Sequence, residues 1–260
     1  MTTATRDWDA GSYDSFRHLR LRPARDLLAQ VRRDLPDGPV MDLGCGTGAA
    51  AGLLRQAFGA RALVGLDASA AMLEQVPAGA YDDLEHGDIL DWRPATPPAL
   101  IFSNAVLHWL PDHAALFAHL AGLLAPGGCL AIQMPRQLGN PSHDLIYRTA
   151  HALFPDRFDG KVPVQVAPPA DTFDMLAPLG TATVWETQYL QHLPAPEDGH
   201  PVRAFTQSTA ARPVLTRLDD AETARFLKAY DAALDAAYPR RADGSALMPF
   251  RRQFAVLDRP

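Results

Sequence analysis

Lysine and cysteine are scarce in this sequence, and it has neither a long apolar run nor an excess of positive charge. Lys161 and Lys228 are the only lysines among 24 basic residues, so arginine supplies nearly all of the positive charge, a bias that we attribute to codon usage. The 30 acidic residues leave a net charge of −6. We expect no nucleic-acid partner, because binding to phosphates requires a basic surface. No apolar run reaches the length of about 18 residues that a membrane span needs, so we expect no membrane partner.

Two cysteines, Cys45 and Cys129, are too few for a disulfide framework or a structural zinc site. The first residues contain no apolar leader. These features predict a reduced, cytoplasmic protein, and we expect no metal cofactor. The length of 260 residues exceeds a typical domain of ~150 and fits one α/β domain with an additional lobe. The oligomeric state does not follow from the sequence.

Apolar segments of strand length alternate with segments of helical spacing from residue 24 to residue 134. This alternation predicts a parallel sheet with right-handed crossovers. A proline-rich region follows, and its two strand-like segments are expected to complete the sheet. We therefore expect an α/β fold: a Rossmann-like, seven-stranded, mostly parallel sheet with helices on both faces and a mainly helical cap. The expected strands are 39–43, 61–67, 83–86, 99–103, 129–134, 181–189 and 250–257, and the expected helices are 24–33, 49–58, 69–76, 112–124 and 219–238.

These elements predict three segments within a single integrated domain. Residues 1–35 form a helical lid segment, and residues 36–135 form the Rossmann-like core. Residues 136–260 form a cap with the last strands of the sheet. The cap pieces, 136–180 and 195–245, are expected over the carboxyl edge of the sheet.

The strongest local motif is a glycine turn between the first expected strand and the next helix, at residues 40–48 (VMDLGCGTG). Glycines permit a left-handed backbone and a close approach of a ligand. Gly44, Gly46 and Ala49 also satisfy the G-x-G-x-x-A fingerprint of dinucleotide-binding proteins. A turn that serves packing alone is a further alternative.

Two carboxylates help to separate these alternatives. Asp42 precedes the first glycine by two positions, where it would repel a pyrophosphate but attract a cationic amino or sulfonium group. The turn is followed by no lysine or arginine until Arg55, so nothing nearby neutralises phosphates. Asp67 lies 19 residues after Gly48, at the end of a strand, where a carboxylate can accept the hydroxyls of a ribose. An adenosine-containing cation without phosphates, S-adenosylmethionine, fits this pattern.

Further cofactor contacts are expected along the same edge of the sheet. Asp88 is placed to bind an adenine amino group, with Ile89 against the ring; alternatively, it is an ordinary turn residue. Asn104 follows the fourth strand, at the edge where open α/β sheets bind ligands, unless it only caps a helix. Trp8 and Tyr13 either cover the cofactor or anchor the N-terminal segment. The predicted cofactor residues are Trp8, Tyr13, Asp42, Gly44, Gly46, Gly48, Asp67, Ala68, Met72, Asp88, Ile89 and Asn104.

Residues scattered outside the glycine turn match one known family. They are Trp8, Tyr13, Phe16, Arg22, Pro23, Asn104, Ala105, 109–113, 133–135, Pro141, His143, Trp185, Thr187, Tyr189, Arg212, Pro213, Tyr238, Pro239, Phe250, Arg252 and Phe254. Over residues 36–134 the chain resembles the class I S-adenosylmethionine-dependent methyltransferases. Over nearly its whole length it is similar to the trans-aconitate 2-methyltransferase family, which methylates one carboxylate of a small tricarboxylic acid. The resemblance implies that the chain forms a methyl ester and releases S-adenosyl-L-homocysteine.

The sequence departs from that family on the expected substrate side. His108 stands where glutamine or a similar polar residue is expected, and Arg251 replaces a proline. Residues 210–213 (AARP) replace the more usual Gly-Leu before Arg-Pro, and the proline-containing segment 194–202 is altered. These departures affect the choice of acceptor and leave the cofactor assignment unchanged.

Arginine suits a carboxylate acceptor, because its planar fork binds a carboxylate in a bidentate manner. We expect the acceptor to contact Arg22, Arg212 and Arg252, which come from distant parts of the chain; each is alternatively a solvated surface charge. Weaker candidates are Arg17 and Arg20. The remaining predicted acceptor residues are His108, His143 and Tyr189, for which helix-end or packing roles are the alternatives.

Three functions are consistent with these residues. The first is a carboxyl O-methyltransferase acting on aconitate-like acids by holding the two reactants in attack geometry, without a catalytic base. The second keeps the cofactor but methylates another organic acid or a natural-product hydroxyl. The third is a protein that binds S-adenosylmethionine without catalysis.

Overall fold

The computed structural model describes residues 17–137, 139–162 and 166–260, with side chains from Leu21 onward. The described chain forms two compact units. One, the sheet unit, consists of Arg17–Pro135, Gln165–Thr187 and Arg252–Pro260, and the other, the helical unit, consists of Arg136–Val164 and Gln188–Arg251. Two predicted cofactor residues, Trp8 and Tyr13, lie outside the described residues, as does Phe16.

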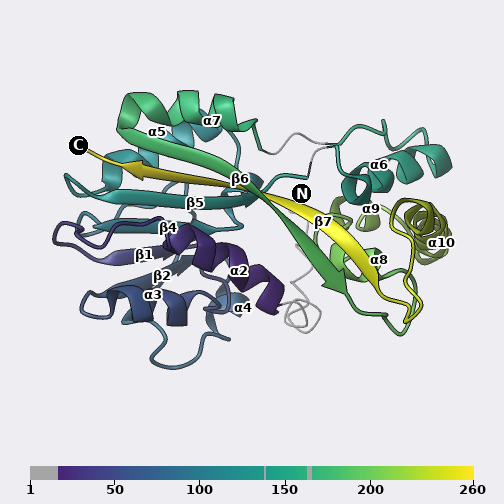
Figure 1. The fold of residues 1–260 in the computed structure, drawn as a ribbon, viewed down its shortest axis with the longest axis horizontal. Coiled ribbons are helices and arrows are strands. Elements are labelled where there is room, and N and C mark those ends of the chain that lie inside the picture. Colours follow the sequence, from purple (N-terminus) through teal and green to yellow (C-terminus); the bar gives the residue numbers. More distant parts are fainter. Residues whose placement is uncertain (1–16, 138, 163–165) are drawn as a thin grey trace. The chain divides into compact units, whose positions relative to one another are not determined.

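A seven-stranded sheet with the order β3-β2-β1-β4-β5-β7-β6 confirms the predicted fold class. The strands β3, β2, β1, β4 and β5 pair in parallel, and β7 pairs antiparallel with β5. Within the sheet unit, α2 and α5 both pack against β5, and α5 also packs against α7 (Figure 1). The strands are β1 (Val40–Leu43), β2 (Leu63–Asp67), β3 (Asp83–His86), β4 (Leu100–Asn104), β5 (Cys129–Pro135), β6 (Thr181–Leu193) and β7 (Ala246–Asp258). The helices of the sheet unit are α2 (Arg17–Leu28), α3 (Ala51–Phe58), α4 (Ala70–Leu73), α5 (His113–Leu123) and α7 (Pro169–Leu176), with short 3₁₀ turns at Leu107–Trp109 and Ala177–Leu179.

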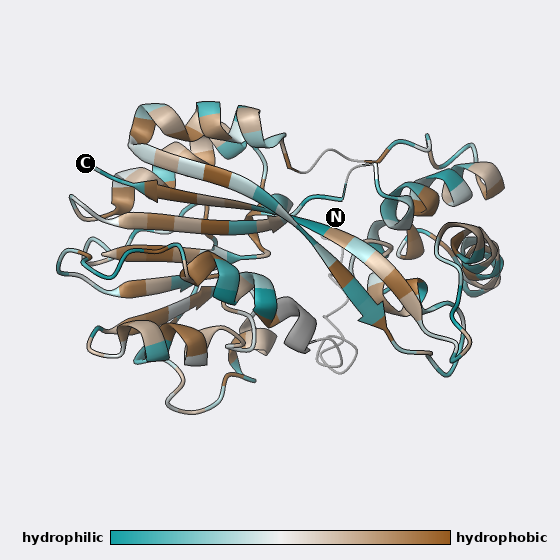
Figure 2. Ribbon diagram, in the orientation of Figure 1, coloured by the Kyte–Doolittle hydropathy of each residue, from teal (hydrophilic) through white to brown (hydrophobic). Residues whose placement is uncertain are grey.

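The central strands of the sheet carry the core. Every residue of β1 is buried, and so are all residues of β4 and β5 except the last of each. Parallel strands covered on both faces are buried along their length and mostly apolar, and much of the ribbon of these strands is brown in Figure 2. The burial leaves the carboxyl ends of β1, β2 and β4 as the places where polar side chains gather.

Two helices differ from the prediction. The apolar stripe predicted for 24–33 is buried, but α2 begins earlier, at Arg17, and ends at Leu28, after which the backbone continues in i→i−3 turns. Helix α4 starts after the predicted cap Ser69 but ends at Leu73 instead of continuing to residue 76. After Leu73 the backbone continues in i→i−3 turns as far as Val76, just before Pro77.

The helical unit is built from helices of the region predicted as the cap. The bounds are α6 (Pro141–Leu153), α8 (Pro201–Thr206), α9 (Arg212–Leu215) and α10 (Asp220–Ala237). Helix α10 confirms the helix predicted at 219–238, and it packs against α6 and α8. Both β6 and β7 are longer than predicted, and each passes through the two units. Among the described residues, no helix is long and apolar enough to cross a membrane.

Candidate functional site

The glycine turn adopts a backbone that side chains would not tolerate. Gly44 and Gly46 have φ values of +71° and +55°. A Cβ atom on Gly44 would lie 2.3 Å from a methyl group of Val106, whereas a Cβ on Gly46 would meet nothing within 4 Å. The first glycine therefore allows the turn to pack against the loop after β4. The second leaves open space above its backbone, as a closely approaching ligand requires.

Asp67, the last residue of β2, ties the glycine turn to the loop that leads into α4. Its carboxylate accepts hydrogen bonds from the backbone N–H of Gly46 at 2.8 Å and of Ser69 at 2.9 Å, one on each oxygen. A carboxylate has about four acceptor positions, so each oxygen retains capacity for another donor. The two hydroxyls of a ribose would be suitable donors.

Asp42, which is predicted to direct its charge at the turn, is buried beside Tyr81. Its side chain is 2% exposed, and its Oδ2 accepts a hydrogen bond from the Tyr81 hydroxyl at 2.6 Å. The pKa of Asp42 is raised to about 7: burial is the main cause, the charge of Asp67 adds to it, and the hydrogen bond from Tyr81 opposes it. The carboxyl group is therefore enclosed by protein, with the Tyr81 hydroxyl as its hydrogen-bond donor.

Asn104 ends β4 beside the turn. Its Oδ1 is shielded from solvent, and no donor to it is found among the described residues. The next residue, Ala105, has a φ of +61° and donates its N–H to the carbonyl of Gln133 at 2.8 Å. A left-handed conformation at a residue other than glycine is a form of strain that concentrates at functional sites. The strained loop places an unsatisfied acceptor at the sheet edge, suited to an amino group.

The remaining predicted cofactor residues lie in the sheet unit with separate local roles. Asp88 is exposed, and its Oδ1 accepts the N–H of Leu90 in a turn. Ile89 is buried in the core, and Met72 lies in α4 with 8% exposure. The carbonyl of Ala68 contacts Nε2 of His86 at 3.1 Å.

Sequence reasoning missed Tyr81 and His86, which contact the predicted residues Asp42 and Ala68. His86 is the last residue of β3, one strand from Asp67, and its position could have been inferred from the expected strand order. Tyr81 lies in the connection between α4 and β3, where no local pattern indicates a partner.

Arg252 is a buried arginine in the sheet unit, 4% exposed on β7. Its guanidinium donates to Oε1 of Gln133, which is itself completely buried on β5, at 3.3 Å. Gln133 is also the register partner of Asn104 on β4. One glutamine thus links a predicted cofactor residue to a predicted acceptor residue across neighbouring strands.

Arg22 and His108 are the other predicted acceptor residues of the sheet unit. Arg22 is exposed on α2. His108 is 6% exposed in the 3₁₀ turn after β4, and its ring lies 4.6 Å from that of Trp109. His108 therefore lies in the turn that follows Asn104, the last residue of β4.

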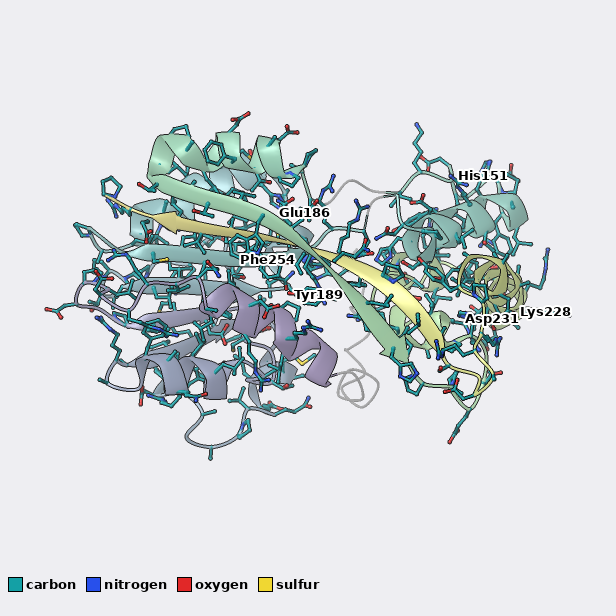
Figure 3. The ribbon with its side chains drawn as sticks, viewed as in Figure 1. His151, Glu186, Tyr189, Lys228, Asp231 and Phe254 are labelled. Carbon is teal, nitrogen blue, oxygen red and sulfur yellow. The ribbon has the colours of Figure 1, made fainter. Side chains whose placement is uncertain are left out.

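Three predicted acceptor residues belong to the helical unit. His143, on α6, has its Nδ1 3.1 Å from Oγ of Ser142, and its ring makes an edge contact with Phe250. Tyr189 lies on β6 and is 5% exposed (Figure 3). Arg212 is the first residue of α9. Within the part of the chain that the structure describes, no group of three or more acidic, histidine or cysteine residues could hold a metal ion.

Comparisons with known proteins point to one enzyme family. A family model described as "Methyltransferase domain" matches residues 13–200. The chain is 42% identical to the trans-aconitate 2-methyltransferase of Methylobacterium nodulans, covering 97% of this chain and 98% of that protein. It is 41% identical to the enzyme of the same name from an Azoarcus species, covering 96% and 98%.

Solved structures show the same fold at low identity. The YcgJ protein of Bacillus subtilis gives a TM-score of 0.56 at 15% identity, over 94% of this chain and 99% of that chain. Phosphoethanolamine N-methyltransferase 2 of Haemonchus contortus gives 0.51 at 16% identity, over 90% of this chain and 52% of that chain.

Proposed function

Because the chain belongs to the trans-aconitate 2-methyltransferase family and is therefore an S-adenosylmethionine-dependent methyltransferase, we propose that it methylates one carboxylate of a small polycarboxylic acid such as trans-aconitate. The products are a methyl ester and S-adenosyl-L-homocysteine. The buried Arg252 is the observation that carries the choice of a carboxylate acceptor. Gln133 holds its guanidinium, and Arg252 lies on β7, two strands away from β4 in the sheet.

The residues at the carboxyl ends of β1, β2 and β4 fit S-adenosylmethionine. The open space above Gly46 admits a ligand close to the backbone, and the acceptor capacity of Asp67 suits ribose hydroxyls. The shielded Oδ1 of Asn104 suits the amino group of the methionine moiety. The buried Asp42 supplies negative charge close to the turn. When bound, S-adenosylmethionine supplies a methyl group activated by attachment to a sulfonium.

The remaining cofactor residues are kept as proposals. Ala68 and Met72 follow Asp67, and Asp88 and Ile89 follow β3, all in the sheet unit. Trp8 and Tyr13 are proposed to cover the cofactor.

A carboxylate acceptor needs orientation more than proton transfer. Carboxyl groups with a reference pKa near ~4 are ionised at neutral pH, so the attacking oxygen requires no general base. The residues need to hold that oxygen in line with the methyl group, and effective positioning contributes roughly 7–11 kcal/mol in well-oriented systems. Arg252 presents a planar fork to a carboxylate, and Gln133 restricts the orientation of that fork. Arg22, His108, His143, Tyr189 and Arg212 are proposed as further contacts of the acceptor.

The register of the sheet supports the closeness of acceptor and cofactor. Gln133 on β5 lies between Asn104 on β4 and the strand that carries Arg252. Neighbouring strands are about 4.8 Å apart, so Asn104 and Arg252 lie on strands separated by roughly 10 Å.

The proposal is tested by mass spectrometry of the products formed from a mixture of di- and tricarboxylates and S-adenosylmethionine. We expect a mass increase of one methyl group on an aconitate-like acid. In Arg252→Ala, kcat/KM for that acid should fall by roughly two orders of magnitude, since a charge-assisted pair contributes about 1.5–3 kcal/mol. Arg148→Ala, at an exposed position on α6, is the matched control. Unchanged kinetics of Arg252→Ala on every accepted acid would rule out the role of this arginine.

A second candidate keeps the cofactor and changes the acceptor to another organic acid or a hydroxyl. It is favoured by His108 and His143, because an imidazole can accept the proton of a hydroxyl, whereas a carboxylate acceptor needs no such group. Incubating an acceptor panel with methyl-labelled cofactor distinguishes the two candidates. Cofactor binding without label transfer to any acceptor would instead indicate a non-catalytic binding protein.

We propose a cytoplasmic location and no nucleic-acid partner. The free, buried thiols of Cys45 and Cys129 support a reduced environment, and the net charge of −6 disfavours phosphate backbones. Cell fractionation and a DNA-binding assay at low salt test the two statements.

A further inference from the structure

Tyr81 has no assigned role, yet it is buried against the cofactor turn. It lies in the connection between α4 and β3, and its side chain is 8% exposed. We propose that Tyr81 is a positioning residue for S-adenosylmethionine. Its hydroxyl fixes the carboxylate of Asp42 next to the glycine turn, and its ring packs against the turn.

The hydroxyl contact is short and well defined. The Tyr81 oxygen donates to Oδ2 of Asp42 at 2.6 Å, a distance typical of a hydrogen bond to an ionised carboxylate. Asp42 is 2% exposed, so water has little access to its charge. An acceptor of this kind, buried without its donor, is costly.

The ring of Tyr81 fills the space between the turn and β2. A Cβ on Gly48 would lie 3.3 Å from Cε2 of Tyr81, and a Cβ on Gly65 would lie 3.3 Å from Cδ1. Two glycines thus face the same ring, one in the turn and one in the neighbouring strand. A side chain at either position would crowd the ring, so the ring or its neighbours would have to shift.

The next residue anchors Tyr81 to the sheet. Asp82 donates its N–H to the carbonyl of Leu63 at 2.8 Å, and its carboxylate accepts from the N–H of Leu63 at 2.7 Å and from Arg55 at 3.0 Å. These three bonds fix the chain at the start of β2, so the adjacent tyrosine has little freedom to move away from Asp42.

The charge of Asp42 depends on its surroundings. The titratable groups that face it are Tyr81 from the α4–β3 connection, Asp67 from β2 and Cys45 from the turn. Burial and Asp67 favour the protonated carboxyl, and Tyr81 alone among these three groups favours the carboxylate. Removing the Tyr81 hydroxyl should therefore raise the pKa of Asp42 further. The carboxyl would then stay uncharged up to a higher pH and attract a cationic ligand less strongly.

The test is isothermal titration of Tyr81→Phe with S-adenosylmethionine from pH 6 to pH 9, without an acceptor. The substitution keeps the ring and removes only the hydroxyl. We expect the Kd at pH 7.5 to rise roughly tenfold, and the midpoint of the pH dependence of binding to move to higher pH. Tyr147→Phe, on α6 in the helical unit, is the matched control and should leave both quantities unchanged.

A double-mutant cycle with Asp42→Asn separates the proposed role from a general structural role. If Tyr81 acts through the charge of Asp42, adding Tyr81→Phe to Asp42→Asn should change the Kd by less than twofold. An equal loss of affinity in both backgrounds, or an unchanged Kd and pH midpoint in Tyr81→Phe, would overturn the proposal. Wild-type protein that binds no S-adenosylmethionine at any pH would instead contradict the cofactor assignment itself.

Discussion

At the scale of single residues, the site places a buried acid where an apolar or neutral group would give the folded protein more stability. Asp42 is 2% exposed and close enough to Asp67 for their charges to interact. Ionising such a carboxyl in the folded protein is unfavourable. This loss of stability agrees with the proposed role of Asp42 in cofactor binding, because binding sites often lower stability in exchange for function.

Asp42→Asn should stabilise the protein at alkaline pH. The folded-state pKa of Asp42, about 7, is above its ordinary value of 3.8. The folded protein therefore binds this proton more tightly than the unfolded chain does. The stability that the proton contributes is fully present below pH 3.8 and is lost as the pH rises through 7. Asparagine cannot ionise, so its advantage should grow over that range to on the order of a few kcal/mol.

Urea unfolding of Asp42→Asn and wild type at pH 5 and pH 8 measures this difference. The exposed Asp37→Asn is the control for loss of a carboxylate. A gap in unfolding free energy that is equal at both pH values would contradict the raised pKa. Affinity for S-adenosylmethionine should fall in the same variant.

At the scale of elements, the sequence predicted most of the elements in the sheet unit because each carries a local signal. The strand at Asp83–His86 and the helix opened by Asp112 lie where they were expected. Helix α2 was misplaced because its prediction rested on apolar spacing from Ala24 onward, whereas the helix begins at Arg17 and contains Pro23, a residue that usually marks a helix start. The buried surface of Ala24 and Leu27 outweighs that local preference.

The site was less predictable than the elements for a related reason. The glycine turn, Asp67 and Asn104 could be proposed from the sequence because each lies at the carboxyl end of a strand. The partner of Asp42 was not, since Tyr81 is 39 residues away in an irregular connection. Contacts between residues so far apart in the sequence depend on tertiary packing, and no local sequence pattern predicts them.

The N-terminus of α10 provides a test at this scale. Asp219 and Glu222 form a capping box, in which each side chain accepts the backbone N–H of the other. Asp219→Ala should lower the free energy of unfolding by about 1 kcal/mol. Asp220→Ala, one position into the helix, keeps the box and is the control. Chemical denaturation measures both, and equal stability of the two variants would contradict a role for the cap.

At the scale of the whole molecule, the two units share strands and so are expected to unfold together. Residues 181–187 of β6 and 252–258 of β7 belong to the sheet unit, and the remainders of both strands belong to the helical unit. Unfolding either unit alone would leave half of each long strand without its neighbours. This connectivity supports the prediction that the chain is one integrated domain.

Hydrogen exchange at increasing denaturant tests that prediction. Peptides from α10 report on the helical unit, and peptides from β4 report on the sheet unit. Since the units share β6 and β7, we expect the slowest-exchanging amides of both peptides to reach the same opening free energy. S-adenosylhomocysteine, added as a ligand, should raise both by the same amount, because binding stabilises the whole cooperative unit. An increase confined to β4 would mean that the helical unit unfolds independently, and the single-domain prediction would then be wrong.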